Sequence, residues 1–258
     1  MLPTIHVLGL PIQTFGLALA CGFLAAGVAG ARHLKERGAP VDWAYEMIFA
    51  ALVGGLIGAR LYWLVEHPSE FSDDPLGSLF GGTGLTWYGG ALGGALFVIG
   101  WARWRRMPIA EAADVVAVPL AIGYALGRIG CQLSGDGDYG KPWDGPWAMG
   151  YPKGTVPTAP GVTVHPTPIY ETLAMGLLAY LLWTNRHRFA PGVLFGLYLI
   201  GAGVERFLVE FLRRNTDDIA GILTEAQLIS IFMVVAGVLI ARRRRTAAGG
   251  RGARLLYG

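Results

Sequence analysis

The chain has 258 residues, of which 53% are hydrophobic and only 15% are charged, and its formal net charge is +3. Soluble domains carry about a quarter charged residues, so this composition excludes an ordinary soluble protein. The mean hydropathy of +0.45 and the 39 glycines predict an all-α membrane protein, because small residues let membrane helices approach closely. Two cysteines, Cys21 and Cys131, are too few for a disulfide framework or a thiolate metal site.

Seven apolar stretches approach the length of about twenty residues that spans a hydrocarbon core. They cover residues 12–31, 43–65, 87–102, 115–133, 168–184, 192–212 and 222–241. We therefore predict a domain of seven transmembrane helices over residues 1–245. A short basic tail without fixed structure is expected over residues 246–258.

Lysine and arginine predict the orientation, because short loops rich in these residues stay in the cytoplasm. Basic residues follow the first, third, fifth and seventh stretches, namely Arg32, Lys35, Arg37, Arg103, Arg105, Arg106, Arg186, Arg188 and Arg242 to Arg245. The loops at about 66–86 and 136–166 are acidic or poor in basic residues. We expect both loops and the N terminus outside, and the C terminus in the cytoplasm.

Two short patterns have a second interpretation. The run Ala18-Leu19-Ala20-Cys21 resembles a lipoprotein cleavage box. A signal peptide, however, needs a basic segment before its apolar region, and no Lys or Arg precedes this run. The arginines 242–245 resemble a nucleic-acid patch, but a basic run directly after a membrane span favours contact with anionic lipid. We expect a lipid bilayer, and no nucleic acid, as the partner of this segment.

Charged residues inside the apolar stretches point to a polar site. They are Arg60, Arg128, Glu171, Glu205, Arg206 and Glu210. In the predicted orientation all of them lie in the outer half of the bilayer, whereas side chains that only snorkel would reach both interfaces. Arg206 and Glu210 share a helix face, which we expect Arg213 and Arg214 to extend. The alternative is a set of ion pairs that only hold helices together, but three arginines favour a phosphate-bearing ligand.

The stretch from Gly127 to Gly140 is the centre of this hypothesis. Arg128 follows an uncharged apolar run, and an arginine at membrane depth costs about 2.5–3.5 kcal/mol, so its partner must be sought. Five glycines in these fourteen residues permit positive φ and close approach to a ligand. We expect the membrane helix to end within this stretch so that the backbone can approach a ligand. The alternative is a helix end that only packs against its neighbours, with Arg128 extending to the lipid headgroups.

The combined motifs resemble the bacterial phosphatidylglycerol–prolipoprotein diacylglyceryl transferase family. They are Gly54-Gly55 with Gly58 and Arg60, Tyr88-Gly89-Gly90, Gly127-Arg128-Ile129-Gly130 before Tyr139-Gly140, His165-Pro166 with Tyr170-Glu171, Glu205-Arg206-Phe207, and Val209-Glu210-Phe211-Leu212-Arg213. The resemblance implies a seven-helix inner-membrane enzyme that moves diacylglycerol from phosphatidylglycerol to the lipobox cysteine of a preprolipoprotein signal peptide. Glycerol phosphate is released. No Walker loop, dinucleotide fingerprint or metal-ligand spacing occurs, so we expect neither cofactor nor metal.

The resemblance also implies roles for individual residues. It assigns catalysis to Arg128, Arg206, Tyr88, Glu210 and Asp136, and substrate binding to Arg128, Arg60, Gly89, Gly140, His165, Tyr170, Glu171 and Arg213.

The chain departs from the family pattern at several of these places. Tyr88 stands where the family usually has histidine, Cys131 and Ser134 where it has asparagine, and Phe15 where it has tyrosine; Asp136 replaces a glutamate, with one extra residue before Tyr139. These departures leave open which of Tyr88, Asp136 and Glu210 deprotonates the acceptor thiol. They also leave open a covalent intermediate on Cys131, and a homologue that binds or translocates anionic phospholipid without transfer. A secondary transporter is disfavoured, because seven spans do not divide into inverted halves.

Overall fold

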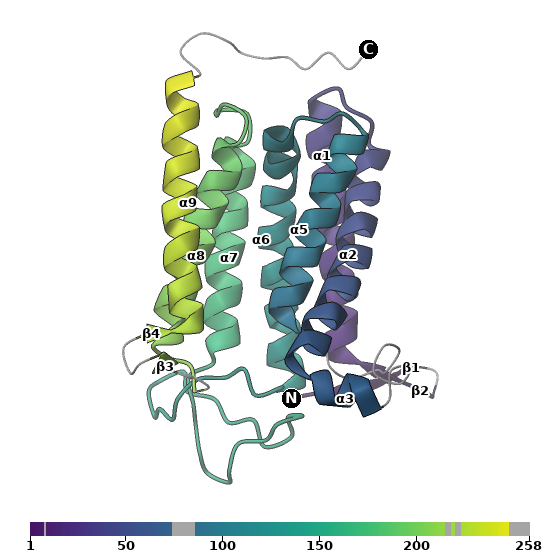
Figure 1. The fold of residues 1–258 in the computed structure, drawn as a ribbon. Coiled ribbons are helices and arrows are strands. Elements are labelled where there is room, and N and C mark those ends of the chain that lie inside the picture. The colour runs from purple at the N-terminus through teal and green to yellow at the C-terminus, as the bar shows by residue number, and fades with distance from the viewer. Residues whose placement is uncertain (8, 74–85, 215–217, 220–222, 248–258) are drawn as a thin grey trace. The chain divides into compact units, whose positions relative to one another are not determined.

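A computed structural model of the chain describes residues 1–7, 9–73, 86–214, 218–219 and 223–247. Seven long helices dominate the described residues (Figure 1). They are α1 (Thr14–Glu36), α2 (Asp42–Glu66), α5 (Trp87–Trp104), α6 (Ile109–Ser134), α7 (Thr167–Asn185), α8 (Val193–Glu210) and α9 (Glu225–Ala247). Each corresponds to one predicted apolar stretch, which confirms the all-α class.

Four of these helices are long and apolar enough to cross a membrane by themselves: α1, α2, α6 and the segment Glu225–Arg242 of α9. The protein is therefore a multi-pass helical membrane protein. The predicted tail falls mostly on residues 248–258, and much of the predicted loop 66–86 falls on residues 74–85; these positions lie outside the described residues.

Three small elements were not predicted. An antiparallel hairpin of β1 (Thr4–Val7) and β2 (Leu10–Gln13) precedes α1, and α3 (Pro68–Asp73) follows α2. A second hairpin, β3 (Asp218–Ile219) with β4 (Leu223–Thr224), leads into α9. There, Gln227 Oε1 accepts the backbone N–H of Thr224 at 3.1 Å, and Thr224 Oγ1 accepts that of Gln227 at 3.2 Å. This reciprocal capping box starts the helix.

The described residues divide into two compact units, one built from residues within 1–30 and 113–247 and the other from residues within 31–112. In the second unit, α2 and α5 lie side by side (Figure 1) because glycines face each other. A Cβ on Gly58 would lie 2.3 Å from the carbonyl oxygen of Gly89, and one on Gly93 would lie 2.2 Å from that of Gly54. The two backbones therefore touch, as small residues allow in membrane helices.

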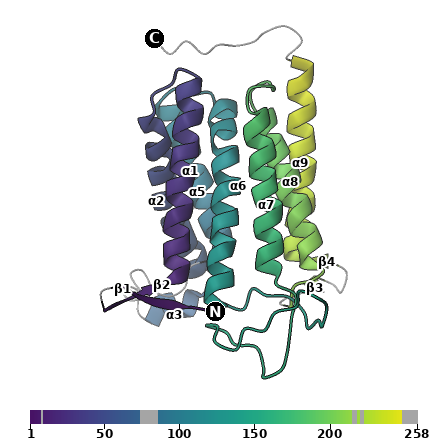
Figure 2. The ribbon, with the colours of Figure 1, turned by 180° about the vertical axis from the view of Figure 1, so that it is seen from behind.

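In the first unit, α1, α6, α7, α8 and α9 form the helical bundle, which Figure 2 shows from behind. Its core is built largely from small residues: Ala29, Ala117, Val118, Ala121, Ala125, Met175, Ala179, Leu182, Leu194 and Ala202 are all buried. Glycines again bring neighbouring helices together, since a Cβ on Gly196 would lie 2.9 Å from the carbonyl oxygen of Gly237 on α9.

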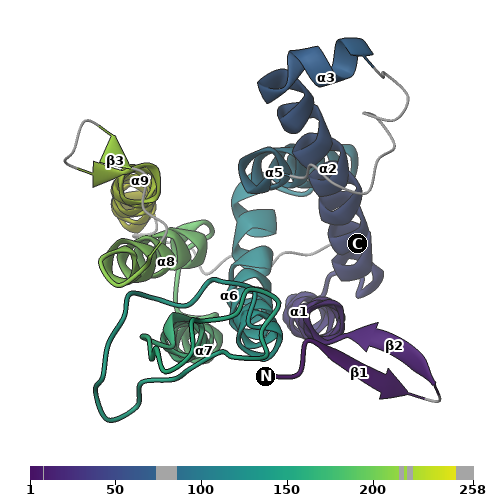
Figure 3. The same cartoon turned by 90° about the horizontal axis from the view of Figure 1, so that it is seen from below.

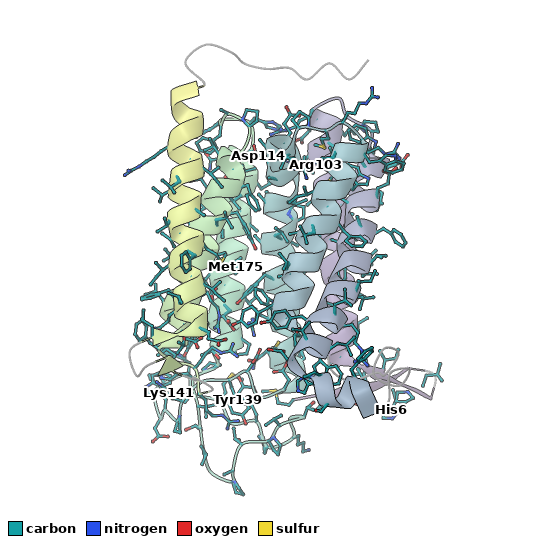
Figure 4. The ribbon with its side chains drawn as sticks, in the orientation of Figure 1. His6, Arg103, Asp114, Tyr139, Lys141 and Met175 are labelled. Atoms are coloured by element: carbon teal, nitrogen blue, oxygen red, sulfur yellow. The ribbon has the colours of Figure 1, made fainter. Side chains whose placement is uncertain are left out.

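The two ends of this unit differ in chemistry. Figure 4 shows Asp114 towards one end, Tyr139 beyond the other and Met175 between them. Asp114 is buried, and its carboxylate accepts the backbone N–H groups of Gly192 (2.8 Å) and Phe195 (2.9 Å) at the start of α8. A carboxylate is favourable there, because helix N-termini leave N–H groups unpaired and carry partial positive charge.

At the Tyr139 end, the loop between α6 and α7 passes across the ends of these helices, as Figure 3 shows from below. The helix ends within the stretch Gly127 to Gly140, as we expected, but only after Arg128. Helix α6 continues to Ser134, and the left-handed backbone conformations occur at Gly135 (φ 59°) and Gly137 (φ 98°). Arg128 is therefore carried on a regular helix.

Candidate functional site

Two arginines from distant parts of the chain meet on one aspartate. Arg128 of α6 donates from Nη1 to Asp138 Oδ2, and Arg213, three residues beyond α8, donates from Nη2 to Asp138 Oδ1 at 2.5 Å. The carboxylate of Asp138 thus bridges the two guanidinium groups. Charge-assisted hydrogen bonds of this kind are about twice as strong as neutral ones.

Glu171, in the second turn of α7, completes the link between these arginines. Its side chain is fully buried, with Oε2 3.2 Å from Nε of Arg128 and Oε1 3.7 Å from Nη1 of Arg213. Tyr124, one turn before Arg128 on α6, donates its hydroxyl to Glu171 Oε1 at 3.0 Å and accepts from Arg128 Nη2 at 3.2 Å. Arg128 is therefore held on three sides.

A third arginine lies on α8. Arg206 contacts Glu210 four residues later at 2.6 Å, and the side chain of Glu210 is buried. This confirms the predicted i, i+4 pair. The expectation that Arg213 extends the same helix face was wrong, because α8 ends at Glu210 and the backbone of Arg213 pairs with Gly140 in an isolated bridge. That pairing turns Arg213 towards Asp138.

The charges at this site act on Asp138. Burial alone raises the pKa of a carboxyl group, but the positive charges of Arg128 and Arg213 and their hydrogen bonds outweigh it, so the pKa of Asp138 lies below its ordinary value. Asp138 is therefore a carboxylate at neutral pH, and it fixes the positions of both arginines.

The loop is fastened to the helices beside this aspartate. Gly140 donates its N–H to the carbonyl of His165 at 2.8 Å, and Thr167 Oγ1 donates to the carbonyl of Asp138 at 2.6 Å. A Cβ on Gly140 would lie 2.5 Å from the carbonyl oxygen of Leu212, so only glycine fits where the loop passes the segment after α8. The fold of the site therefore requires glycine at position 140, independently of any contact of Gly140 with substrate.

His165 and Tyr170 form part of an aromatic group near the start of α7. The ring of His165 stacks on Trp143 with centroids 4.4 Å apart, and its Nδ1 is 3.4 Å from the hydroxyl of Tyr170. That hydroxyl accepts the indole N–H of Trp147 at 2.7 Å, and Trp147 is 60% exposed. Amphipathic rings at the end of a membrane helix are typical of the membrane–water interface.

Asp136 stabilises the turn that precedes Asp138. Its Oδ1 accepts the backbone N–H of Asp138 at 3.2 Å, which stabilises the turn, while Asp138 makes the contacts to the arginines. Tyr139 stacks on Tyr151 with centroids 4.7 Å apart, and burial raises the pKa of the Tyr151 hydroxyl to about 12. The role assigned to Asp136 stays a prediction.

Cys131 lies at the edge of the cluster. Its buried thiol is 3.7 Å from Asp138 Oδ2 and 3.9 Å from Arg128 Nη1. Cys131, Asp136 and Asp138 offer three donor atoms within 4.8 Å of one another, but two guanidinium groups already neutralise Asp138, which makes this a poor cation site. Of the other departures, Ser134 donates to the carbonyl of Cys131 at 3.2 Å, and Phe15 packs against Gly130.

Three predicted residues belong to the second unit. Arg60 is buried on α2, with its guanidinium carbon 4.8 Å from the centre of the Trp63 ring. Tyr88 is 37% exposed and meets Trp87 edge to face. Gly89 lies in the close contact of α2 with α5, so the fold itself requires glycine there.

Asp138 and Tyr124 belong to the site but were not predicted from the sequence. Tyr124 stands four residues before Arg128, the spacing of neighbours on one helix face, and this signal was available. Asp138 had no such signal, because its position depends on the path of the loop.

The fold and the site define a multi-pass membrane protein with three arginines and several carboxylates gathered at one end of a helical bundle. The sequence model of the prolipoprotein diacylglyceryl transferase family matches residues 3–242. The chain is similar to the phosphatidylglycerol–prolipoprotein diacylglyceryl transferase of Clostridium tetani, at 33% identity over 91% of this chain and 94% of the relative. It is also similar to the enzyme of that name from Idiomarina loihiensis, at 32% identity over 93% and 91%. The chain belongs to the prolipoprotein diacylglyceryl transferase family.

Proposed function

We propose that this chain transfers the diacylglyceryl group of phosphatidylglycerol to the lipobox cysteine thiol of preprolipoprotein signal peptides. It acts in the bacterial inner membrane, with seven spans, a periplasmic N terminus and a cytoplasmic C terminus. The alternation of basic residues between loops supports this orientation. The family membership supports the reaction.

One observation supports the arginine cluster as the place where the lipid phosphate binds. Nη1 of Arg206 and Nη1 of Arg213 are buried and have no hydrogen-bond partner within the parts of the chain that the structure describes. A buried donor without a partner costs about 1–3 kcal/mol, and more for a charged group. Phosphate oxygens would satisfy both donors, because a guanidinium group matches phosphate geometry.

The proposed reaction is a direct displacement. The thiolate attacks the glyceryl carbon next to the phosphate, the carbon–oxygen bond breaks, and its electron pair passes to the phosphate ester oxygen. Arg128 and Arg206 stabilise the negative charge that grows on this oxygen, which is usually the largest contribution an active site makes. Asp138 and Glu171 hold Arg128 in place beforehand, so little reorganisation is needed.

The other predicted residues keep their proposed roles. Tyr88, Glu210 and Asp136 are the candidates for accepting the thiol proton. Arg60, Gly89, Gly140, His165, Tyr170, Glu171 and Arg213 are proposed to contact or shape the lipid and peptide substrates.

The test uses purified protein, phosphatidylglycerol and a lipobox peptide, with the mass of the peptide as readout. The parent should add one diacylglyceryl group. Arg128→Lys and Arg206→Lys should each lower the transfer rate by at least about 10²-fold. Lysine keeps the positive charge but cannot form the two parallel hydrogen bonds that the planar guanidinium group makes to a phosphate. Arg60→Lys should be milder.

Arg103→Lys is the matched control. Arg103 is exposed in the last turn of α5, so the same change should leave the rate unaltered. Full activity in Arg128→Lys and Arg206→Lys would mean that these arginines act only as general positive charge. A parent that binds phosphatidylglycerol but never modifies the peptide would instead be a phospholipid-binding homologue.

A further inference from the structure

Glu205 differs from the other carboxylates of the cluster in the partners it has. Asp138 binds Arg128 and Arg213, Glu171 lies between the same two arginines, and Glu210 pairs with Arg206. Glu205 Oε1 is buried and has no hydrogen-bond partner among the described residues. Glu205 is thus the carboxylate left over when the arginines have been paired.

The charges of the cluster lead to the same conclusion. Glu205 lies within electrostatic range of Glu171, Arg128, Arg206 and Arg213. Three arginines therefore face four carboxylates, Asp138, Glu171, Glu205 and Glu210. If all four were ionised, the cluster would carry a net negative charge and would repel a phosphate. An unpaired charge in an apolar interior is costly, and the usual remedy is to take up a proton.

We propose that Glu205 holds a proton and delivers it to the departing phosphate in the transfer reaction, which deepens and rests on the proposed function. When the carbon–oxygen bond breaks, its electron pair moves to the phosphate ester oxygen, and the Glu205 carboxyl O–H protonates that oxygen. The proton released by the attacking thiol then restores the acid. Atoms and charge balance, because the carboxyl proton of Glu205 ends on the released glycerol phosphate, the thiol proton replaces it on Glu205, and the sulfur ends bonded to the glyceryl carbon.

The groups around Glu205 suit this role. Tyr124 and Arg128 of α6, Glu171 of α7, and Arg206 and Tyr198 of α8 lie within electrostatic range of Glu205, as does Arg213 beyond the helix end. The arginines would hold the phosphate beside the acid.

Glu205→Gln tests the proposal, because glutamine has the shape and neutrality of the protonated acid but cannot release a proton. The variant should lower kcat by about 10²-fold or more and leave KM for phosphatidylglycerol unchanged. Turnover by the parent should fall as pH rises through the titration of Glu205, and the variant should lack this alkaline limb. Glu225→Gln, an exposed residue at the start of α9, should match the parent in all three measurements.

A second measurement does not depend on activity. Infrared spectra of the membrane-reconstituted protein without substrate should contain the carbonyl band of a protonated carboxyl group, and Glu205→Gln should lose it. An unchanged kcat and pH profile, or an infrared spectrum without such a band, would overturn the proposal. If the parent shows the band but transfers no lipid, the proposed function fails, and with it the role of Glu205 in transfer.

Discussion

Asp138 is the residue on which the geometry of the arginine cluster depends most. It binds Arg128 and Arg213 at once, and these arginines are 85 residues apart in the sequence. Without this carboxylate, two neighbouring guanidinium groups would repel each other near a membrane. Its function follows from its position between two charges.

We therefore expect Asp138→Asn to weaken both the fold and the reaction. The loss of a partly exposed, charge-assisted bridge should cost about 1.5–3 kcal/mol at neutral pH. The pKa of Asp138 lies below its ordinary value, so its stabilisation is complete above that ordinary value and disappears as pH falls through the lowered one. Thermal unfolding in detergent should show the parent and the variant converging at acid pH.

Asp144→Asn provides the control for this series. Asp144 lies in the same loop, is exposed, and accepts a hydrogen bond from Thr163 at 2.7 Å. It should unfold like the parent at every pH. A constant gap between the parent and Asp138→Asn from neutral to acid pH would contradict the electrostatic explanation.

Tyr88 stands where the family resemblance implies a histidine. If its hydroxyl works as an acid or base in place of histidine, Tyr88→Phe should lower the transfer rate by about 10²- to 10⁴-fold, with little change in unfolding temperature. Tyr88→His should keep or raise the rate. The mass of the lipobox peptide again gives the readout, and equal rates for tyrosine and phenylalanine would move the role to Glu210 or Asp136.

At the scale of whole elements, helices α2 and α5 are joined through glycine. A Cβ at Gly93 would lie 2.2 Å from the carbonyl oxygen of Gly54, whereas a Cβ at Gly100, two turns further along α5, would meet nothing within 4 Å. Both glycines lie on α5, but only Gly93 packs against the backbone of α2. Their substitution should therefore have opposite effects.

Gly93→Ala should destabilise the protein by about 1–3 kcal/mol, since the helices must move apart to admit the methyl group. Gly100→Ala should be neutral or stabilise it by up to about 1 kcal/mol through higher helix propensity. Thermal unfolding of the two variants side by side makes the comparison. Equal effects would show that the glycine contact does not limit the packing of α2 with α5.

At the scale of the whole molecule, the orientation in the membrane decides which leaflet supplies the lipid. We expect the Tyr139 end of the first unit to face the periplasm, because the loop from Asp136 to His165 has only two lysines and no arginine. Phosphatidylglycerol would then enter from the outer leaflet.

Cysteine labelling of intact cells tests this orientation, in a chain whose Cys21 and Cys131 are replaced by serine. A reagent that cannot cross the membrane should label cysteine at Ala159, an exposed loop position before α7, and should not label it at Asn185, where α7 ends. Pro40, which is exposed between α1 and α2, should also stay unlabelled. Labelling of Asn185 and Pro40 without Ala159 would reverse the orientation and remove the site from the outer leaflet.

Most of the architecture was predictable from the sequence, because an apolar run long enough to span a bilayer is a local property. All seven predicted stretches formed helices for this reason. The pairing of Arg206 with Glu210 was also predictable, since helix geometry alone places residues four apart together. Arg128 and Glu171 were recognised because charges inside apolar helices need partners.

The remaining contacts depend on how the backbone travels between helices, which no local pattern specifies. Positive φ at Gly135 and Gly137 directs the loop so that Asp138, and not Asp136, reaches the arginines. The end of α8 at Glu210 and the pairing of Arg213 with Gly140 turn Arg213 off the helix face. The helices and the charged residues on them follow from local patterns in the chain. Which charges meet, and which carboxylate is left without a partner among the described residues, depends on the tertiary fold, because these contacts join segments that are distant along the chain.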